Sequence, residues 1–379
     1  MITVALLAFA LQTAEAVLPT SLAYRFLPGT KAVYTLEVNS ESSPPSNLSS
    51  FRDKTTLVFE RSVLEPDSEG RPRLQVVLKS AKISSEATVN KRPWLSLEYD
   101  SEKSILQLNG DDIRPYLYPQ LIDRPVAITL GQDNRVLTVD GKDEIIQKTM
   151  AGWSSKSQKK SKSNTFDAAL MSGAMSGGYA GAAGAGLGNL IGSAVQKLIQ
   201  TSAEEKKEKY MKIGRELSLK MTVDGIFLSP DTPYSMLVLP NFDPGHPVQP
   251  ADAWRKTWDD SAIVEDMKQA FAALLKDSPI SVPPLLPQQK LVDVKIKTVE
   301  ANTAVLTYSR FSHDSQSQPY VGEIVRSETE SGEVTFNTAR GLVQSLSGKT
   351  EMSVTAGQMV SGVKITVTLR LQEAFSPAL

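Results

Sequence analysis

The sequence contains no cysteine, and this absence excludes several kinds of chemistry at once. Such a chain has no disulfide, no thiolate ligand for a metal, no cysteine nucleophile and no N-terminal cysteine to carry a lipid. The cellular compartment must be judged from other features, because cysteine-free exported proteins and reduced cytosolic proteins look alike by this criterion.

The chain also lacks an excess of either charge. Its 41 Lys and Arg residues balance 42 Asp and Glu residues, which leaves a formal net charge of −1. No overall field therefore attracts nucleic acid or an anionic membrane, and we expect no nucleic-acid partner.

Catalytic motifs are missing as well. The two histidines, His246 and His313, are expected in a proline-rich loop and a polar loop, without the spacing of a metal site. There is no glycine-rich phosphate loop after a strand and no G-x-S-x-G sequence. The pairs Asp111-Asp112 and Asp259-Asp260 are typical of turns and helix starts. We therefore predict no catalytic residue, no cofactor and no metal, and a protein that is not an enzyme.

The N-terminus predicts export. An apolar run from Ile2 to Leu11 is followed by Ala14-Glu15-Ala16, a small-x-small pattern that signal peptidase accepts. The run is shorter than the roughly 20 residues that span a bilayer. No Lys or Arg precedes it, so a buried N-terminal helix or strand is the alternative. We expect a signal peptide over residues 1–16 and an exported, periplasmic or extracellular protein.

Alternating apolar and polar residues predict two β-rich domains. In the N-terminal domain, residues 17–150, strands are expected at 31–39, 54–63, 73–83, 94–99, 104–108, 126–130 and 135–139, with no helix. Turn signals such as Asn109-Gly110 and Asp140-Gly141 separate them. In the C-terminal domain, residues 214–379, strands are expected at 217–225, 290–299, 303–310, 320–329, 333–337, 341–353 and 362–372, and a short helix at 261–276.

The segment between these domains, residues 151–213, has a different composition. A run of lysine and serine leads into a tract in which eight of the twenty residues from Gly173 to Gly192 are glycine and which carries no charge from Ala168 to Gln196. Three interpretations stay open: a linker that passes into a helix over about 185–213, a glycine-rich helix packed on the protein, and a membrane contact. Gly184, Gly188 and Gly192 recur at the four-residue spacing that lets helices approach closely.

The predicted fold is therefore mainly β, with two antiparallel-sheet halves, half-barrel or sandwich-like, joined by a Gly/Ala-rich and helical central segment. If the apolar faces of the halves curve towards each other, they enclose a groove suited to an acyl chain or another hydrophobic ligand. Core packing is the alternative role for each aromatic candidate for this groove, namely Trp94, Tyr116, Tyr118, Trp254 and Trp258.

Several short motifs resemble an uncharacterised family of bacterial exported β-rich proteins, many of them lipoproteins. They are Pro28-Gly29 before Tyr34, Tyr99-Asp100-Ser101, Pro125-Val126 through Val136 to Gly141, Leu239-Pro240, Pro247-Val248 before Trp254, and Phe336-Asn337 to Gly341. The chain departs from the family by lacking the lipid-anchor cysteine, by Asn337 where Asp is usual and by its glycine-rich insertion. The resemblance implies an exported β-rich protein and no established activity.

Two functional hypotheses follow. The first is a non-enzymatic envelope protein that binds a lipid-like or hydrophobic molecule between two curved sheets, or that binds another component of the envelope such as a protein. The second is a structural or assembly protein that contacts a membrane, or other subunits, through the tract 168–200.

Overall fold

The computed structural model describes residues 20–42, 49–89, 91–110, 112–131, 134, 136–157, 219, 223, 242–259, 269, 289–318, 322–356 and 359–375. Most of these residues form one antiparallel sheet with the strand order β5-β4-β3-β2-β1-β13-β12-β11-β10-β9-β8, to which the short β6-β7 ribbon is attached through β3. The strands are β1 (Lys31–Ser42), β2 (Ser49–Leu64), β3 (Arg73–Val89), β4 (Arg92–Asp100), β5 (Ile105–Asn109), β6 (Pro125–Leu130), β7 (Val136–Val139), β8 (Ala253–Asp259), β9 (Gln289–Glu300), β10 (Thr303–Gln318), β11 (Gly322–Asn337), β12 (Leu342–Ala356) and β13 (Met359–Phe375).

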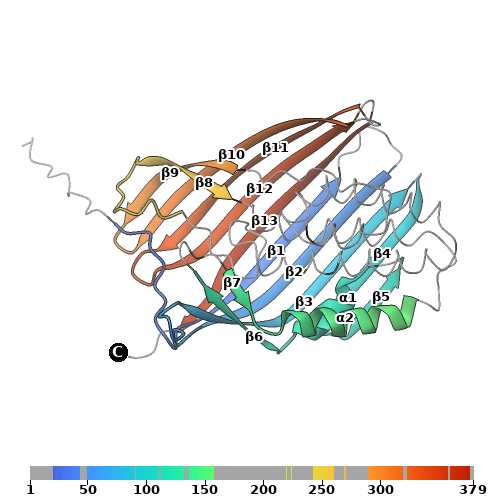
Figure 1. Ribbon diagram of the computed structural model, residues 1–379, viewed down its shortest axis with the longest axis horizontal. Helices are drawn as coiled ribbons and strands as arrows, with labels where there is room; N and C mark the ends of the chain where they lie inside the picture. Colours follow the sequence, from blue (N-terminus) through green and yellow to red (C-terminus); the bar gives the residue numbers. More distant parts are fainter. Residues whose placement is uncertain are drawn as a thin grey trace, which may run out of the picture.

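The two halves of the chain meet along β1 and β13, which lie side by side in the middle of the sheet (Figure 1). These strands pair over the whole of β1, from Lys31 opposite Phe375 to Ser42 opposite Val363. The prediction of a mainly antiparallel β fold is confirmed. The halves join edge to edge, through β1 and β13, in one sheet that is not closed into a barrel.

Alternation along the strands sets the two faces of the sheet, because successive side chains of a strand point to opposite sides. In β1, Ala32, Tyr34 and Leu36 are buried, and in β13 Ile365 and Leu369 are buried. One continuous core of buried apolar residues runs across both halves of the sheet. We call the face that carries this core the inner face and the opposite face the outer face.

Two helices interrupt the N-terminal half, so the prediction that it contains only strands is wrong. They are α1 (Arg114–Leu121) and α2 (Lys142–Ser157), which lie together on the flank of the sheet near β3, β4 and β5 (Figure 1). Helix α1 begins with proline in its first turn, where the missing N–H has no helical partner to lose. Helix α2 runs past the expected domain boundary at residue 150, and its Trp153 is fully buried.

The strand predicted over 217–225 is also wrong at its two described positions. Leu219 and Val223 are helical and fully buried, and a spacing of four residues places both on one side of a helix. Gln269 is helical, in agreement with the predicted helix at 261–276. The expected signal peptide over 1–16 and the tract 168–200 lie outside the described residues.

Candidate ligand-binding face

The inner face changes character along the strands. Near one end of the strands, cross-strand neighbours form a wholly apolar row through seven strands, from β10 to β3. This apolar row consists of Leu306, Val334, Leu346, Leu369, Leu36, Leu57 and Ala81, all buried. Such a row is the ordinary interior of a sheet with one covered face.

Four residues further along the strands, the inner face becomes polar. The register aligns a second row across the same seven strands, in which only one member is apolar. This polar row consists of Arg310, Glu330, Thr350, Ile365, Ser40, Asp53 and Ser85, and each member is no more than 6% exposed. Polar groups are rarely buried without hydrogen-bonding partners, so this row is the unusual part of the inner face.

Between these rows a tyrosine covers two glycines. Gly332 and Gly348 are cross-strand neighbours in β11 and β12, and Tyr308 in β10 lies opposite Gly332. A Cβ atom at Gly332 would come within 2.5 Å of the Tyr308 ring, and one at Gly348 within 2.6 Å of the Tyr308 Oη. The glycines therefore provide the space in which the buried Tyr308 ring lies across its neighbouring strands.

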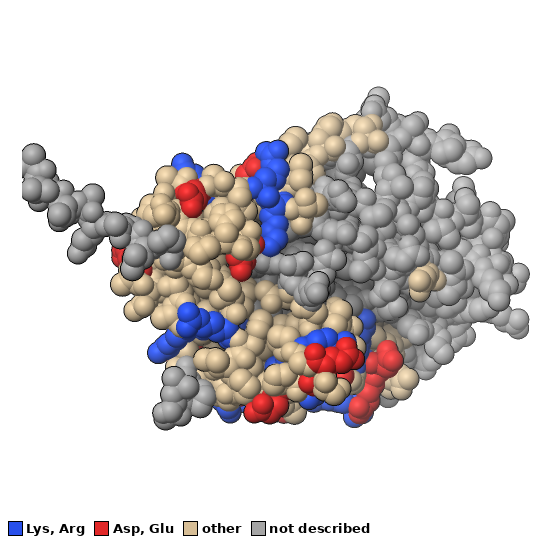
Figure 2. All heavy atoms as spheres, turned by 60° about the vertical axis from the view of Figure 1, so that its left-hand side comes forward, with Lys and Arg blue, Asp and Glu red and all other residues tan. Residues whose placement is uncertain are grey.

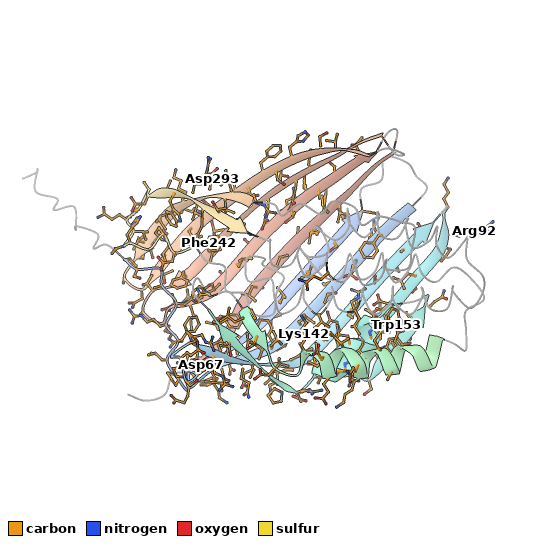
Figure 3. The ribbon with its side chains drawn as sticks, viewed as in Figure 1. Asp67, Arg92, Lys142, Trp153, Phe242 and Asp293 are labelled. Carbon is orange, nitrogen blue, oxygen red and sulfur yellow. The ribbon has the colours of Figure 1, made fainter. Side chains whose placement is uncertain are left out.

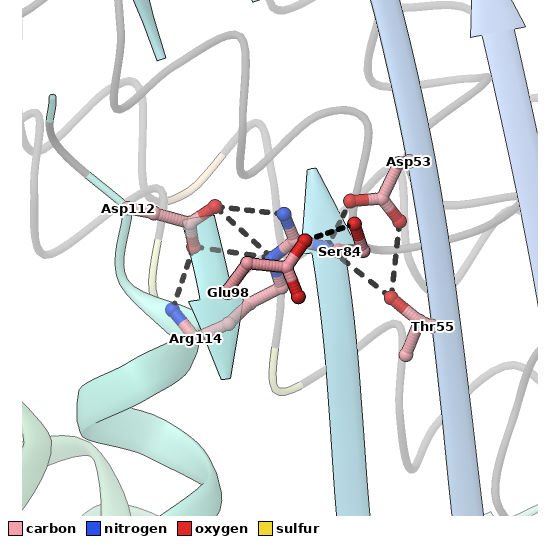
Figure 4. A network of polar contacts seen from close by, with 6 residues as sticks. All are labelled: Asp53, Thr55, Ser84, Glu98, Asp112 and Arg114. Carbon is pink, nitrogen blue, oxygen red and sulfur yellow. Dashed lines mark hydrogen bonds and ion pairs between the residues drawn. The ribbon is translucent and has the colours of Figure 1, made fainter. Parts of the chain in front are cut away.

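Asp53 in the polar row belongs to a fully buried charge cluster (Figure 4). Arg114, at the start of α1, donates from Nη1 to Asp53 Oδ1 at 2.6 Å and from Nη2 to Asp112 Oδ2 at 2.7 Å. Thr55 donates to the second oxygen of Asp53 at 3.0 Å. Burial alone would lower the pKa of Arg114, but the Asp112 and Asp53 carboxylates outweigh that effect and raise it, so the guanidinium stays protonated.

This cluster ties the beginning of α1 to the middle of β2. The same burial raises the pKa of the neighbouring Tyr118 hydroxyl above its usual value, so this phenol stays neutral. With both carboxylates ionised, two negative groups share one guanidinium, which leaves one negative charge in excess at the Asp53 end of the inner face.

A second buried charge cluster lies at the other end of the polar row. Arg310 pairs with Glu328 and, at 2.9 Å, with Glu330, and the side chains of all three are at most 1% exposed. Both clusters join residues of different strands or elements. Each therefore fixes the relative position of its elements, since breaking a buried pair leaves an uncompensated charge.

The N-terminal segment closes the apolar end of the inner face. Tyr24 packs edge-on against Phe336 with ring centroids 5.4 Å apart, and the Arg25 backbone N–H donates to the Gly341 carbonyl at 3.1 Å. Close to them, Arg61 donates a hydrogen bond to the Tyr34 hydroxyl, and this hydroxyl donates to the Val343 carbonyl. Both donor–acceptor distances are 3.1 Å. Burial raises the pKa of the Tyr34 hydroxyl.

The outer face is hydrophilic across the same strands. One row of cross-strand neighbours runs through ten strands without an apolar member: Glu98, Ser84, Lys54, Asn39, Thr366, Lys349, Ser331, Ser309, Asp293 and Arg255. An open depression of about 760 Å³ borders Lys54, Lys349 and Lys364 in this region, together with Glu41 and Glu86. Acidic and basic side chains are intermixed on the described surface seen in Figure 2. The outer face therefore suits contact with water.

The three predicted groove residues whose side chains are described do not form one site. Tyr116 and Tyr118 lie on α1, where Tyr118 is buried 6.5 Å from Tyr99 and Tyr116 is partly buried against the core. Trp254 lies in β8, the strand at the opposite end of the strand order, where it is partly buried against the core opposite Val294. Figure 3 shows Trp153 of α2 on one flank of the molecule and Phe242 and Asp293 on the other.

The remaining predicted site residues lie wholly or in part outside what the structure describes. The side chains of Trp94 and Trp258 are not among those described, although their backbones lie in β4 and β8. Gly184, Gly188 and Gly192 lie outside the described residues. Within the described part of the chain, no group of three or more acidic or histidine side chains is arranged to hold a metal ion. No helix of that part is long and apolar enough to cross a bilayer.

The polar row escaped sequence reasoning, although a signal for it exists. Continuing the apolar positions Tyr34, Leu36 and Val38 by one step reaches Ser40, a polar residue on the buried side of β1. In β2, steps of two residues back from Leu57 reach first Thr55 and then Asp53, both of them polar. Only the strand register shows that these interruptions coincide across neighbouring strands.

No family model matches the chain, and neither does any curated protein. Among solved structures, the chain is similar to lipovitellin, in a structure concerned with lipid–protein interactions, with a TM-score of 0.40 and 8% identity. That match covers 94% of this chain and 26% of the lipovitellin chain, so the chain spans about a quarter of that protein. The chain is also similar to the translocator domain of the autotransporter NalP from Neisseria meningitidis, with a TM-score of 0.26 and 8% identity over 91% of this chain and 88% of that one. These TM-scores are too low to assign a family or a function.

Proposed function

We propose that this protein is a non-enzymatic, exported protein of the bacterial cell envelope that binds an amphipathic, lipid-like molecule on the inner face of its sheet. The change from the apolar row to the polar row carries this proposal. An acyl chain gains by burial against apolar side chains, whereas a polar headgroup needs hydrogen-bonding partners when it leaves water. The inner face offers the first environment at one end of the strands and the second about four residues away.

One further observation favours a lipid over a water-soluble ligand. The outer face is hydrophilic over ten strands, so the large apolar surface of the sheet is confined to one side. The exported location rests on the N-terminal sequence and on the resemblance to exported β-rich proteins. That resemblance implies no activity, and the absence of catalytic motifs is consistent with binding alone.

Mass spectrometry of protein purified from its native envelope tests the proposal. Spectra would be recorded under native conditions and again after denaturing extraction. We expect a stoichiometric lipid-like molecule that is present in the native spectrum and released by denaturation. A protein that is fully folded but carries no lipid in the native spectrum would refute tight lipid binding.

The alternative, a structural protein that acts through the tract 168–200, depends on residues outside those described. Deleting 165–200 separates the two proposals. Under lipid binding by the inner face, we expect the shortened protein to keep its fold and its lipid. Release of a folded, lipid-free protein from membranes after this deletion would favour the alternative.

A further inference from the structure

We infer that the Asp53 end of the polar row is a subsite for a headgroup that carries a protonated primary amine. This inference rests on the proposed lipid binding and names the class of headgroup. It starts from Ser40 and Ser85, which flank Asp53 on the neighbouring strands β1 and β3.

The two serine hydroxyls are buried without a hydrogen-bond partner. Ser40 is 5% and Ser85 1% exposed, and neither Oγ atom has a hydrogen-bond partner in the described part of the chain. An unsatisfied buried polar group costs about 1–3 kcal/mol, the desolvation of that group. A headgroup placed between these strands would supply partners for both hydroxyls and would contact the buried carboxylate that lies between them.

The spacing of these groups fits a headgroup rather than a single atom. Neighbouring strands lie about 4.8 Å apart, so the two serines stand roughly 10 Å from each other with Asp53 between them. An amine at Asp53 leaves both hydroxyls within reach of headgroup oxygens about one strand spacing away. A serine hydroxyl can donate to such an oxygen, as well as accept.

Charge selects the amine. Asp53 and Asp112 share the single guanidinium of Arg114, and Thr55 is the other side chain that donates to Asp53. The cluster therefore has one negative charge in excess when both carboxylates are ionised. A protonated amine next to Asp53 compensates this charge, whereas a headgroup whose only charge is negative adds to it.

Lipid binding with matched acyl chains tests this inference. Purified full-length protein would be titrated with dioleoyl phosphatidylethanolamine and with dioleoyl phosphatidylglycerol, and occupancy measured by native mass spectrometry. We expect the wild type to prefer phosphatidylethanolamine by about tenfold, and Asp53→Asn to reduce this preference to within about twofold while phosphatidylglycerol still binds. Equal binding of both lipids by the wild type would overturn the inference but not the proposed function, whereas failure to bind either lipid would overturn both.

A pair of serine variants protects the test against misfolding of Asp53→Asn. Ser85→Ala removes a hydroxyl that has no partner, so we expect unchanged or higher stability in the absence of lipid. We also expect phosphatidylethanolamine affinity to fall about threefold to tenfold, the loss of one hydrogen bond. Ser84→Ala is the matched control, because Ser84 is the preceding residue of β3, points to the outer face and bonds to Glu98. Equal effects of Ser84→Ala and Ser85→Ala on affinity would contradict the inference.

Discussion

The contact of Tyr308 with two glycines allows a sharp test of how β10, β11 and β12 pack. At Gly348, an added Cβ would lie 2.6 Å from the Tyr308 Oη and 3.9 Å from its next neighbours. The collision thus involves one atom, at the end of a side chain that is 3% exposed and has little room to move. Forcing an extra methyl group into a packed interior typically costs about 1–3 kcal/mol, and we expect Gly348→Ala to lower the free energy of unfolding by that amount.

Removing the colliding atom should remove the cost. Tyr308→Phe deletes the hydroxyl and keeps the ring, so Gly348→Ala should cost less than about 0.5 kcal/mol in the Tyr308→Phe background. The coupling energy of this double-mutant cycle should therefore exceed about 1 kcal/mol. Urea denaturation of the four proteins, with equal m-values as the check for two-state unfolding, supplies the free energies.

Gly332 provides the matched control. A Cβ at Gly332 would meet the Tyr308 ring carbons at 2.5 and 2.6 Å and the Ser347 carbonyl oxygen at 2.5 Å. Tyr308→Phe leaves all these atoms in place, so Gly332→Ala should be destabilising in both backgrounds. If Gly348→Ala costs the same with and without the Tyr308 hydroxyl, the proposed packing of this tyrosine is wrong.

Three further predictions concern other parts of the chain. Arg114→Leu leaves two buried carboxylates without their guanidinium and should lower the free energy of unfolding by about 3–5 kcal/mol, as measured by urea denaturation; a loss below 1 kcal/mol would contradict the ion pairs. Gly341 has a φ of +62°, and a Cβ there would lie 2.5 Å from the Arg25 backbone nitrogen. Gly341→Ala should therefore release the N-terminal segment. Hydrogen exchange should become faster at the Arg25 amide and stay unchanged at amides in β10. Backbone hydrogen bonds, followed by the Arg71 side chain, lower the pKa of Asp67 below 3.8. Its stabilising contribution is therefore complete above that value and is lost as the pH falls through the lowered pKa; Asp67→Asn should make stability less dependent on pH below about pH 4, and an unchanged acid limb would refute this.

The strands could be predicted from the sequence because each has a local signature. In the chain from 290 onwards, alternation places most strands within a few residues of their observed limits, but β10 continues to Gln318, eight residues past its expected end at 310. The segments 320–329 and 333–337 prove to be parts of the single strand β11. The pairing of β1 with β13 could not be predicted, because local alternation does not specify which distant strand a given strand pairs with.

The helices were missed for a related reason. Helix α1 has eight residues and contains Pro115 and Pro119, which argue against a helix when no tertiary structure is known. Leu219 and Val223 fit a period of two as well as a period of four, and packing decides between them. The candidate site depended on register to an even greater degree, because Ser40, Asp53 and Ser85 are unremarkable within their own strands.

The pairing of β1 with β13 also determines how long one edge of β1 stays unpaired while the chain is being synthesised. Strand β1 ends at Ser42, but its partner ends at Phe375, so the ribosome must make more than three hundred further residues before this pairing can be completed. At about 5–20 residues per second, β1 waits on the order of tens of seconds with one edge uncovered. An uncovered strand edge is a template for pairing with other chains. The nascent protein is therefore most prone to aggregate before its final strand emerges, and a chaperone that shields the β1 edge would act during that interval.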